Sequence, residues 1–151
     1  MNKIFREFAL LSAIISLFLV ISFPVHAQQK DNLKDGVFIH ITHGPESAHH
    51  VLMGLQMAVK MAEDGKDVLV YCDIEAVKIL TKSAKPITHE VFMSSHDLLN
   101  RLKELKVEVL ACPTCMKVAH IDISDLRPGV KVASKDLFFS FTKGRILSLD
   151  Y

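Results

Sequence analysis

The sequence predicts an α/β domain in which helices alternate with the strands of a mainly parallel sheet. Two observations lead to this prediction. Short runs of branched apolar residues alternate with segments whose apolar residues recur at three- and four-residue spacing, and Gly or Pro stands at most of the junctions. Such alternation is typical of right-handed crossover units, which place helices on both faces of a parallel sheet. The length of 151 residues suits a single domain.

The domain is expected to begin with a strand followed by a long helix. Residues 36–42 are rich in branched side chains and form the first expected strand, after which Gly44 and Pro45 turn the chain. Residues 46–64 carry apolar side chains at helical spacing, and Gly65 is a suitable C-terminal stop. These features predict the first strand–helix unit.

The remaining elements alternate in the same way. Residues 67–72 are nearly all apolar, the composition of a strand covered on both faces. The other expected strands are 107–111, 130–133 and 145–149. The other expected helices are 74–83, 95–106, 113–120 and 134–142, with a loop from about 86 to 93.

The first 27 residues are predicted to be a cleaved export signal. Lys3 and Arg6 precede an apolar run over residues 8–23, and Val25-His26-Ala27 has the small-residue pattern of a cleavage site. This run is shorter than the ~20 residues of a membrane-spanning helix, so cleavage is favoured over an uncleaved anchor. We therefore expect residues 28–151 to form the single mature domain, located in the periplasm and without a membrane partner.

The balance of charges argues against nucleic acid as a partner. The chain has 18 basic and 17 acidic residues, and no block of basic residues stands out. Proteins that bind nucleic acid through its phosphates normally carry a basic patch.

The sharpest local feature is the C-x-x-C motif of Cys112 and Cys115. Pro113 suits the first position of a helix, which makes Cys112 the N-cap. There, unpaired backbone N–H groups and the helix dipole favour the thiolate, the form that attacks sulfur or binds metal. Cys115 can reach Cys112 to close a disulfide. One such motif fits a redox pair, a sulfur carrier or half a zinc site, and equally a structural disulfide or two buried thiols.

Two other strand ends carry candidate residues. Ligands of open parallel sheets bind beyond the carboxyl ends of the strands, where His43 follows the first strand and Cys72 ends the second. We expect His43 to lie near the thiols as a proton acceptor or a polar neighbour of the cleft. Cys72 is the weaker candidate, because a cysteine that ends a buried strand is more often part of the core. Asp73 belongs either to this rim or to the next helix.

Histidines and methionines raise the question of a metal. His43, His49 and His50, together with cysteine thiolates, could ligate copper or zinc. The three methionines at four-residue spacing, Met53, Met57 and Met61, are expected to pack against a neighbouring element rather than to bind Cu(I). The sequence leaves open whether a metal is bound.

Several segments together resemble the DsrE/DsrF-like family, also called YchN-like, over essentially the whole mature chain. They are His-Ile-Thr-His-Gly-Pro-Glu (40–46), Val-Tyr-Cys-Asp-Ile-Glu-Ala-Val (70–77), Ala-Cys-Pro-Thr-Cys-Met-Lys (111–117), Asp-Leu-Arg-Pro-Gly-Val (125–130) and the ending Gly-Arg-Ile-Leu-Ser-Leu-Asp-Tyr (144–151). The resemblance implies a three-layer α/β/α domain with a five-stranded parallel sheet, assembled into trimers or hexamers.

The resemblance also implies roles for individual residues. Family members that act in sulfur relays carry a persulfide on a cysteine at the end of a central strand, and this cysteine matches Cys112. Cys115 is an addition found in some branches and points towards a disulfide-forming pair. His43 falls in a loop that lines the family's cleft, whereas Cys72 inherits no role. Export departs from the family, whose known relays work in the cytoplasm.

The leading hypothesis is an exported thiol protein that carries sulfur as a persulfide, or exchanges disulfides, through Cys112 and Cys115. Its partner would be a sulfur donor or acceptor protein, or a small sulfur compound, and no cofactor is required. One alternative is a copper- or zinc-binding module that uses these cysteines with His43 or Cys72. The other is a non-catalytic, oligomeric interaction subunit with a structural disulfide. The sequence does not decide between a catalyst and a carrier.

Overall fold

The computed structural model describes residues 33–151, so the predicted export signal at 1–27 lies outside the described residues. Five strands form one sheet in the order β4-β3-β2-β1-β5, and every neighbouring pair is parallel. The strands are β1 (Gly36–Ile41), β2 (Asp67–Cys72), β3 (Glu108–Ala111), β4 (Val130–Val132) and β5 (Ile146–Asp150). The predicted five-stranded α/β architecture is therefore confirmed.

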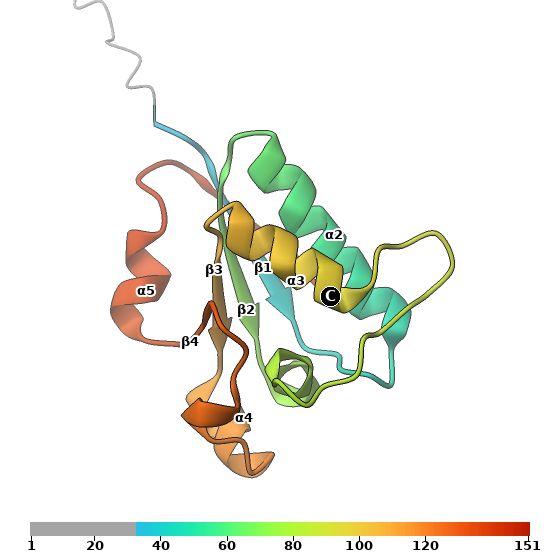
Figure 1. The fold of residues 1–151 in the computed structure, drawn as a ribbon. Helices are drawn as coiled ribbons and strands as arrows, with labels where there is room; N and C mark the ends of the chain where they lie inside the picture. Colours follow the sequence, from blue (N-terminus) through green and yellow to red (C-terminus); the bar gives the residue numbers. More distant parts are fainter. Residues whose placement is uncertain (1–32) are drawn as a thin grey trace, which may run out of the picture. The chain divides into compact units, whose positions relative to one another are not determined.

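Helices cover the two faces of the sheet unequally. The α-helices are α2 (Ala48–Glu63), α3 (Ser95–Glu104), α4 (Pro113–Val118) and α5 (Lys135–Ser140), and the 3₁₀ helices are η1 (Ile74–Leu80) and η2 (Ile123–Asp125). Helices α2 and α3 lie on one side of the sheet, α5 lies on the other, and α4 follows the end of β3 (Figure 1). Within residues 33–151, no helix combines the length and the apolar character that crossing a bilayer requires.

The segment after β2 is the main difference from the expected elements. A helix was expected over residues 74–83, and the structure has the shorter 3₁₀ helix η1. Its buried residues are Ala76, Val77, Ile79 and Leu80. These form two pairs three residues apart, and residues at this spacing share a face in a 3₁₀ helix. Both pairs belong to the hydrophobic core, so this face of η1 packs against the rest of the domain.

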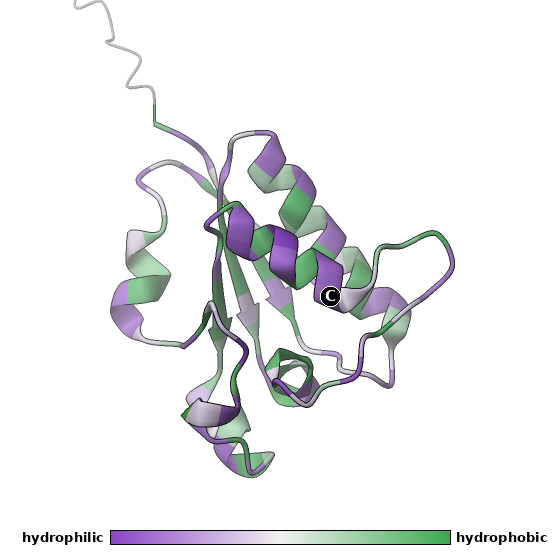
Figure 2. Cartoon of the chain, in the orientation of Figure 1, coloured by the Kyte–Doolittle hydropathy of each residue, from purple (hydrophilic) through white to green (hydrophobic). Residues whose placement is uncertain are grey.

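The core lies between the sheet and the layer formed by α2, α3 and η1. Alternate strand residues point into it, as the period of two requires. The strands contribute Val37, Ile39, Ile41, Val68, Val70, Cys72, Val109 and Ala111, and the two long helices contribute Val51, Leu52, Leu55, Ala58, Val59, Leu98 and Leu102. In Figure 2, hydrophobic and hydrophilic residues alternate along α2 and α3, as in helices with one buried face.

The opposite face of the sheet is covered less completely. Phe38, His40 and Tyr71 alternate with the core residues of β1 and β2, and all three stay half-buried. Phe138 of α5 packs on this face, with its ring centroid 5.9 Å from that of Phe38 and 4.9 Å from that of Tyr71. Polar side chains can therefore lie on this face, near the carboxyl ends of the strands, without complete burial.

Candidate functional site

Cys112 is the N-cap of α4, as the sequence predicts. β3 ends at Ala111, Cys112 has extended backbone angles (φ −65°, ψ 119°), and Pro113 opens the helix. The N–H of Cys112 donates to the carbonyl oxygen of Cys72 at 3.0 Å, which ties this junction to the end of β2. The Cys112 side chain is half-buried. Strand pairing and the helix start therefore fix the position of its sulfur.

The surroundings of Cys112 favour the thiolate. Burial alone would raise the pKa of Cys112. The nearby Tyr71 hydroxyl, the backbone N–H and thiol of Cys115, and the backbone N–H of Thr114 outweigh burial in their effect on this pKa. Donors directed at a sulfur stabilise its charged form, so the pKa of Cys112 lies below its ordinary value. Cys112 is therefore the better nucleophile of the pair.

Cys115 lies in the first turn of α4, within hydrogen-bonding reach of the Cys112 sulfur. Both cysteines are free thiols. The N–H of Ile74 donates to Cys115 Sγ at 3.1 Å. Burial raises the pKa of Cys115, the nearby Cys112 and Asp73 raise it further, and the hydrogen bond from Ile74 does not offset them. The site therefore pairs a thiol of lowered pKa, Cys112, with a neighbouring thiol of raised pKa, Cys115.

The donor to Cys115 has unusual backbone geometry. Ile74 has a φ of +47°, although its side chain is β-branched. Such residues avoid this region, and backbone strain of this kind concentrates at functional sites. The Ile74 side chain is 58% exposed, so its own packing is a weak reason for the conformation. The conformation instead accompanies an N–H directed at the Cys115 sulfur.

The histidine that the structure links to the thiol site is His40. Its ring stacks on that of Tyr71, with centroids 5.5 Å apart. Its Nδ1 lies 2.9 Å from Asp150 Oδ1, and its Nε2 lies 3.1 Å from Asp73 Oδ2. Tyr71, in turn, donates its hydroxyl to Cys112. Side chains from β1, β2 and β5, together with Asp73 and Cys112 directly after β2 and β3, therefore form one polar cluster at the carboxyl ends of the strands.

Most of this cluster was missed by reasoning from the sequence. His40 and Tyr71 lie within strands that were expected to supply core residues, Asp150 lies one residue beyond the expected strand 145–149, and Asp73 was expected either at the rim or in the next helix. The alternation of side chains along the strands was the available signal. His40 and Tyr71 stand between apolar residues that face the core, so their own side chains must face the other side of the sheet.

His43 lies just beyond the carboxyl end of β1, on the side of the sheet that α2 covers. Its ring stacks on that of His50 with centroids 4.4 Å apart, and its Nδ1 lies 3.2 Å from the Thr42 hydroxyl. Within residues 33–151, the hydrogen bonds and ring contacts of His43 connect it to these residues. A role beside the thiols stays a prediction for His43.

Cys72 belongs to the core. Its side chain is 0% exposed and packs among the apolar residues under α2 and η1. Burial raises the pKa of this thiol, and the charge of Asp73 raises it further. Cys72 is therefore a protonated, inaccessible thiol.

The proposed metal ligands are not gathered in one place. Within residues 33–151, no group of three or more His, Cys, Asp or Glu side chains is arranged to hold a metal ion. Cys72 faces the core, and the ring and hydroxyl contacts of His43 lie with His50 and Thr42. The described part of the chain thus brings together two of the expected ligands, Cys112 and Cys115.

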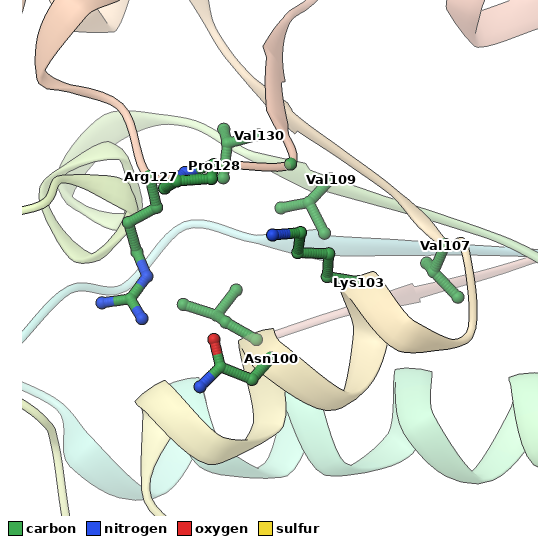
Figure 3. A pocket seen from close by; sticks show the side chains of 9 residues that line it. Asn100, Lys103, Val107, Val109, Arg127, Pro128 and Val130 are labelled. Atoms are coloured by element: carbon green, nitrogen blue, oxygen red, sulfur yellow. The ribbon is translucent and has the colours of Figure 1, made fainter.

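Two hollows differ in their relation to the thiols. One, of about 260 Å³, opens beside Cys115 and is lined by Ile74, Glu75, Lys78, Cys115, Val118 and Ala119. Of the two cysteines of the pair, Cys115 lines this hollow. The other lies between α3 and the first residues of β3, with Asn100, Lys103 and Arg127 on its walls (Figure 3). None of its lining residues is a cysteine, histidine or carboxylate, so it is not part of the thiol site.

Comparison with known proteins identifies relatives of the chain. The model of the DsrE/DsrF-like family matches residues 35–140. Among solved structures, the YchN protein from E. coli is 19% identical with a TM-score of 0.62, and MTH1491, a protein of unknown function from Methanobacterium thermoautotrophicum, is 18% identical with a TM-score of 0.56. Each likeness covers 77% of this chain and 99% of the other, and at these identities it concerns the fold. No curated protein sequence matches the chain.

Proposed function

The chain belongs to the DsrE/DsrF-like family, which is generally linked to sulfur relay, and from this premise we propose that it is an exported thiol protein that carries sulfur through Cys112 and Cys115. The observation that carries the proposal is the asymmetry of the pair. The surroundings of Cys112 lower its pKa, whereas those of Cys115 raise its pKa. A nucleophilic thiolate next to a protonated thiol is the arrangement that capture and release of sulfur require.

Capture begins with attack by the Cys112 thiolate on the outer sulfur of a donor persulfide, R–S–SH. A bond forms between Cys112 Sγ and that sulfur, the donor S–S bond breaks, and its electron pair leaves with R–S⁻. Cys112 then carries –S–SH. The same attack on a disulfide, R–S–S–R′, would instead leave a mixed disulfide on Cys112 and release R′–S⁻.

Release uses Cys115. Its thiol loses a proton and attacks Cys112 Sγ, so that the intramolecular disulfide forms and the outer sulfur leaves as HS⁻. The two cysteines lose two electrons and the departing sulfur gains them. An external dithiol reductant then returns the pair to its reduced form by exchange. When an acceptor thiol attacks the persulfide first, the sulfur passes on without this oxidation.

The surroundings of the pair support a carrier role. The Tyr71 hydroxyl and the backbone N–H groups of Thr114 and Cys115 that stabilise the Cys112 thiolate can also stabilise a persulfide anion. The hollow beside Cys115 leaves room for a donor or acceptor sulfur.

Location and assembly belong to the same proposal. The predicted signal at 1–27 is the ground for the periplasm. The family resemblance is the ground for a homo-oligomer, a trimer or a hexamer, and for a sulfur donor or acceptor as the partner.

Mass spectrometry of the purified protein tests the proposal. Cys115→Ser, treated with polysulfide, should gain one sulfur atom on Cys112, and a reductant should remove it. The matched control is the Cys112→Ser, Cys115→Ser double variant, in which buried Cys72 should gain none. If Cys112 forms no adduct in the single variant, the proposal is wrong.

The two alternatives predict other results. Stoichiometric copper or zinc after anaerobic purification, lost in Cys112→Ser, would indicate the metal-binding module. A melting temperature that falls on reduction, in a protein that never forms a Cys112 adduct, would indicate the interaction subunit with a structural disulfide. Such a short loop should stabilise the fold only modestly.

A further inference from the structure

Asp73 lies between the thiol pair and His40. The residue that follows it, Ile74, donates its N–H to Cys115 Sγ at 3.1 Å. On its other side, Asp73 Oδ2 lies 3.1 Å from His40 Nε2, and the Asp73 side chain is only 19% exposed. Its charge also contributes, after burial and Cys112, to the raised pKa of Cys115. Asp73 therefore contacts an imidazole through its carboxylate and immediately precedes, in the chain, the residue whose N–H contacts the Cys115 sulfur.

The contact between Asp73 and His40 leaves hydrogen-bonding capacity unused. Their 3.1 Å approach lacks the alignment of a hydrogen bond, and both His40 Nε2 and Asp73 Oδ1 are buried without a partner in the described part of the chain. Buried polar atoms normally have partners, so two unpartnered atoms beside reactive thiols call for an explanation. His40 Nδ1, in contrast, is held by Asp150 at 2.9 Å.

We propose that Asp73 accepts the proton of Cys115 when this thiol closes on Cys112, and that His40 is the positioning residue that orients the Asp73 carboxylate. This inference rests on the proposed function, because it concerns the release step. His40 can orient Asp73 because its own ring is fixed on two sides, by Asp150 at Nδ1 and by stacking on Tyr71.

The step balances in atoms and electrons. The S–H bond of Cys115 breaks, its proton moves to the Asp73 carboxylate, and its electron pair forms the bond to Cys112 Sγ. The bond from Cys112 Sγ to the outer sulfur breaks, and that sulfur leaves with the electron pair. Asp73 then gives the proton to the departing sulfur or to water and returns to the carboxylate.

Other groups around Asp73 are poorer acceptors. Burial, together with nearby negative charges, raises the pKa of Tyr71, so its hydroxyl stays protonated and donates to Cys112. Cys72 is fully buried on the opposite face. The titratable groups whose contacts or charges involve Asp73, from β1, β2, β5 and α4, are His40, Tyr71, Cys115, the chain neighbour Cys72 and, beyond His40, Asp150.

A two-phase thiol assay separates this step from the first attack. The reduced protein is mixed with one equivalent of dithiobis(nitrobenzoate), and the release of thionitrobenzoate is followed by absorbance. The first phase reports attack by Cys112, and the second reports closure by Cys115. The variants are Asp73→Asn and His40→Gln, with Asp64→Asn as the carboxylate control. Asp64 directly follows α2 and is 69% exposed.

Asp73→Asn should keep the first phase and slow the second by roughly 100-fold near pH 7, the lower end of the usual contribution of a general base. The difference should shrink as the pH rises past the ordinary thiol pKa, because hydroxide then removes the Cys115 proton. His40→Gln should slow the second phase several-fold, and Asp64→Asn should match the wild type. Asp73→Glu, which restores a carboxylate, should recover part of the rate.

The outcomes distinguish the inference from the proposed function. A second phase with the same rate and pH profile in Asp73→Asn and in the wild type overturns the inference and leaves the proposed function standing. Absence of the first phase in the wild type speaks against Cys112 as the nucleophile, and so against the proposed function itself. If Asp73→Asn does not fold, His40→Gln decides in its place, and an unchanged second phase again overturns the inference.

Discussion

Cys72 and Cys112 are neighbours at the same edge of the sheet, yet they are placed in opposite environments. The strand register pairs Cys72 with Ala111, so Cys112 lies one residue farther along its chain. Because successive strand residues face opposite sides, Cys72 points into the core and is 0% exposed. Cys112 belongs to the half-open side, where Tyr71 lies. An offset of one residue separates a structural thiol from a candidate nucleophile.

The two thiols also differ in acidity, because, among the residues that the structure describes, hydrogen-bond donors surround the sulfur of Cys112 and not that of Cys72. Burial raises the pKa of both, and at Cys72 the charge of Asp73 adds to it. At Cys112, the Tyr71 hydroxyl, Cys115 and the N–H of Thr114 outweigh burial and lower the pKa. The comparison shows that a partly buried thiol can have a lowered pKa when hydrogen-bond donors surround its sulfur.

The largest expected effect is on thiol labelling of the native protein. Cys112→Ser should slow alkylation by iodoacetamide near pH 7 by about 30-fold or more, because an ordinary thiol is only a few per cent ionised there. Cys115, with its raised pKa, is ionised still less. Cys72→Ala should keep the wild-type rate. Equal alkylation rates in Cys112→Ser and the wild type would show that Cys112 is not the reactive thiol and would contradict the contrast drawn between Cys112 and Cys72.

The second largest effect is expected when Cys112 loses the hydroxyl of Tyr71, its hydrogen-bond donor from β2. Tyr71→Phe removes the hydroxyl that donates to Cys112 and keeps the ring that packs on His40 and Phe138. The pKa of Cys112 should rise towards its ordinary value, and alkylation near pH 7 should slow by about tenfold, as expected for a hydrogen bond to a charged group. The rates of the two proteins should converge at alkaline pH. A rate that is unchanged at every pH would exclude Tyr71 as the important donor.

A smaller effect is expected on stability when the core thiol is replaced. Cys72→Ala should lower the free energy of unfolding near pH 7 by about 1 kcal/mol, since a small group leaves a packed core. Urea unfolding with circular dichroism measures this loss.

The pH dependence of that stability has a definite sign. The pKa of Cys72 is raised in the folded state, so its contribution is fully present below the pKa of the unfolded thiol. Above that value the unfolded chain loses the proton first, and stability falls with a slope of up to about 1.4 kcal/mol per pH unit. The Cys72→Ala variant should lack the part of the alkaline fall in stability that Cys72 causes. An identical alkaline slope in the two proteins would contradict the burial of Cys72.

The smallest effect is expected at the histidine that the sequence placed beside the thiols. The contacts of His43 are with Thr42 and His50, so His43→Gln should change the alkylation rate of Cys112 by less than about twofold, the effect of a residue with no direct interaction. His40→Gln is the informative partner, measured in the same pH series. A several-fold loss in His43→Gln would restore the role that the sequence analysis gave it.

Local rules made part of the fold and of the site predictable. The five strands followed from apolar runs, and the position of Cys112 as N-cap followed from Pro113, because both depend on residues close together in the chain. The 3₁₀ form of η1 was not predicted, because the apolar spacing of its residues suits an α-helix equally well. The polar cluster was not predicted because it depends on contacts between residues far apart in the chain. His40 and Asp150 meet because β1 and β5 pair in parallel, across 110 residues of sequence.

The order of residues along the chain was enough to predict the alternation of strands and helices and to place Cys112 and Cys115 within one helical turn of each other. Both results depend on interactions between residues only a few positions apart, which periodicity and capping rules describe. The folded chain was needed to show which thiol faces the core, which hydroxyl lies beside Cys112, and that His40 rather than His43 joins the cluster. The physical reason is strand register, because hydrogen bonds between neighbouring strands decide which distant residues lie side by side and on which face.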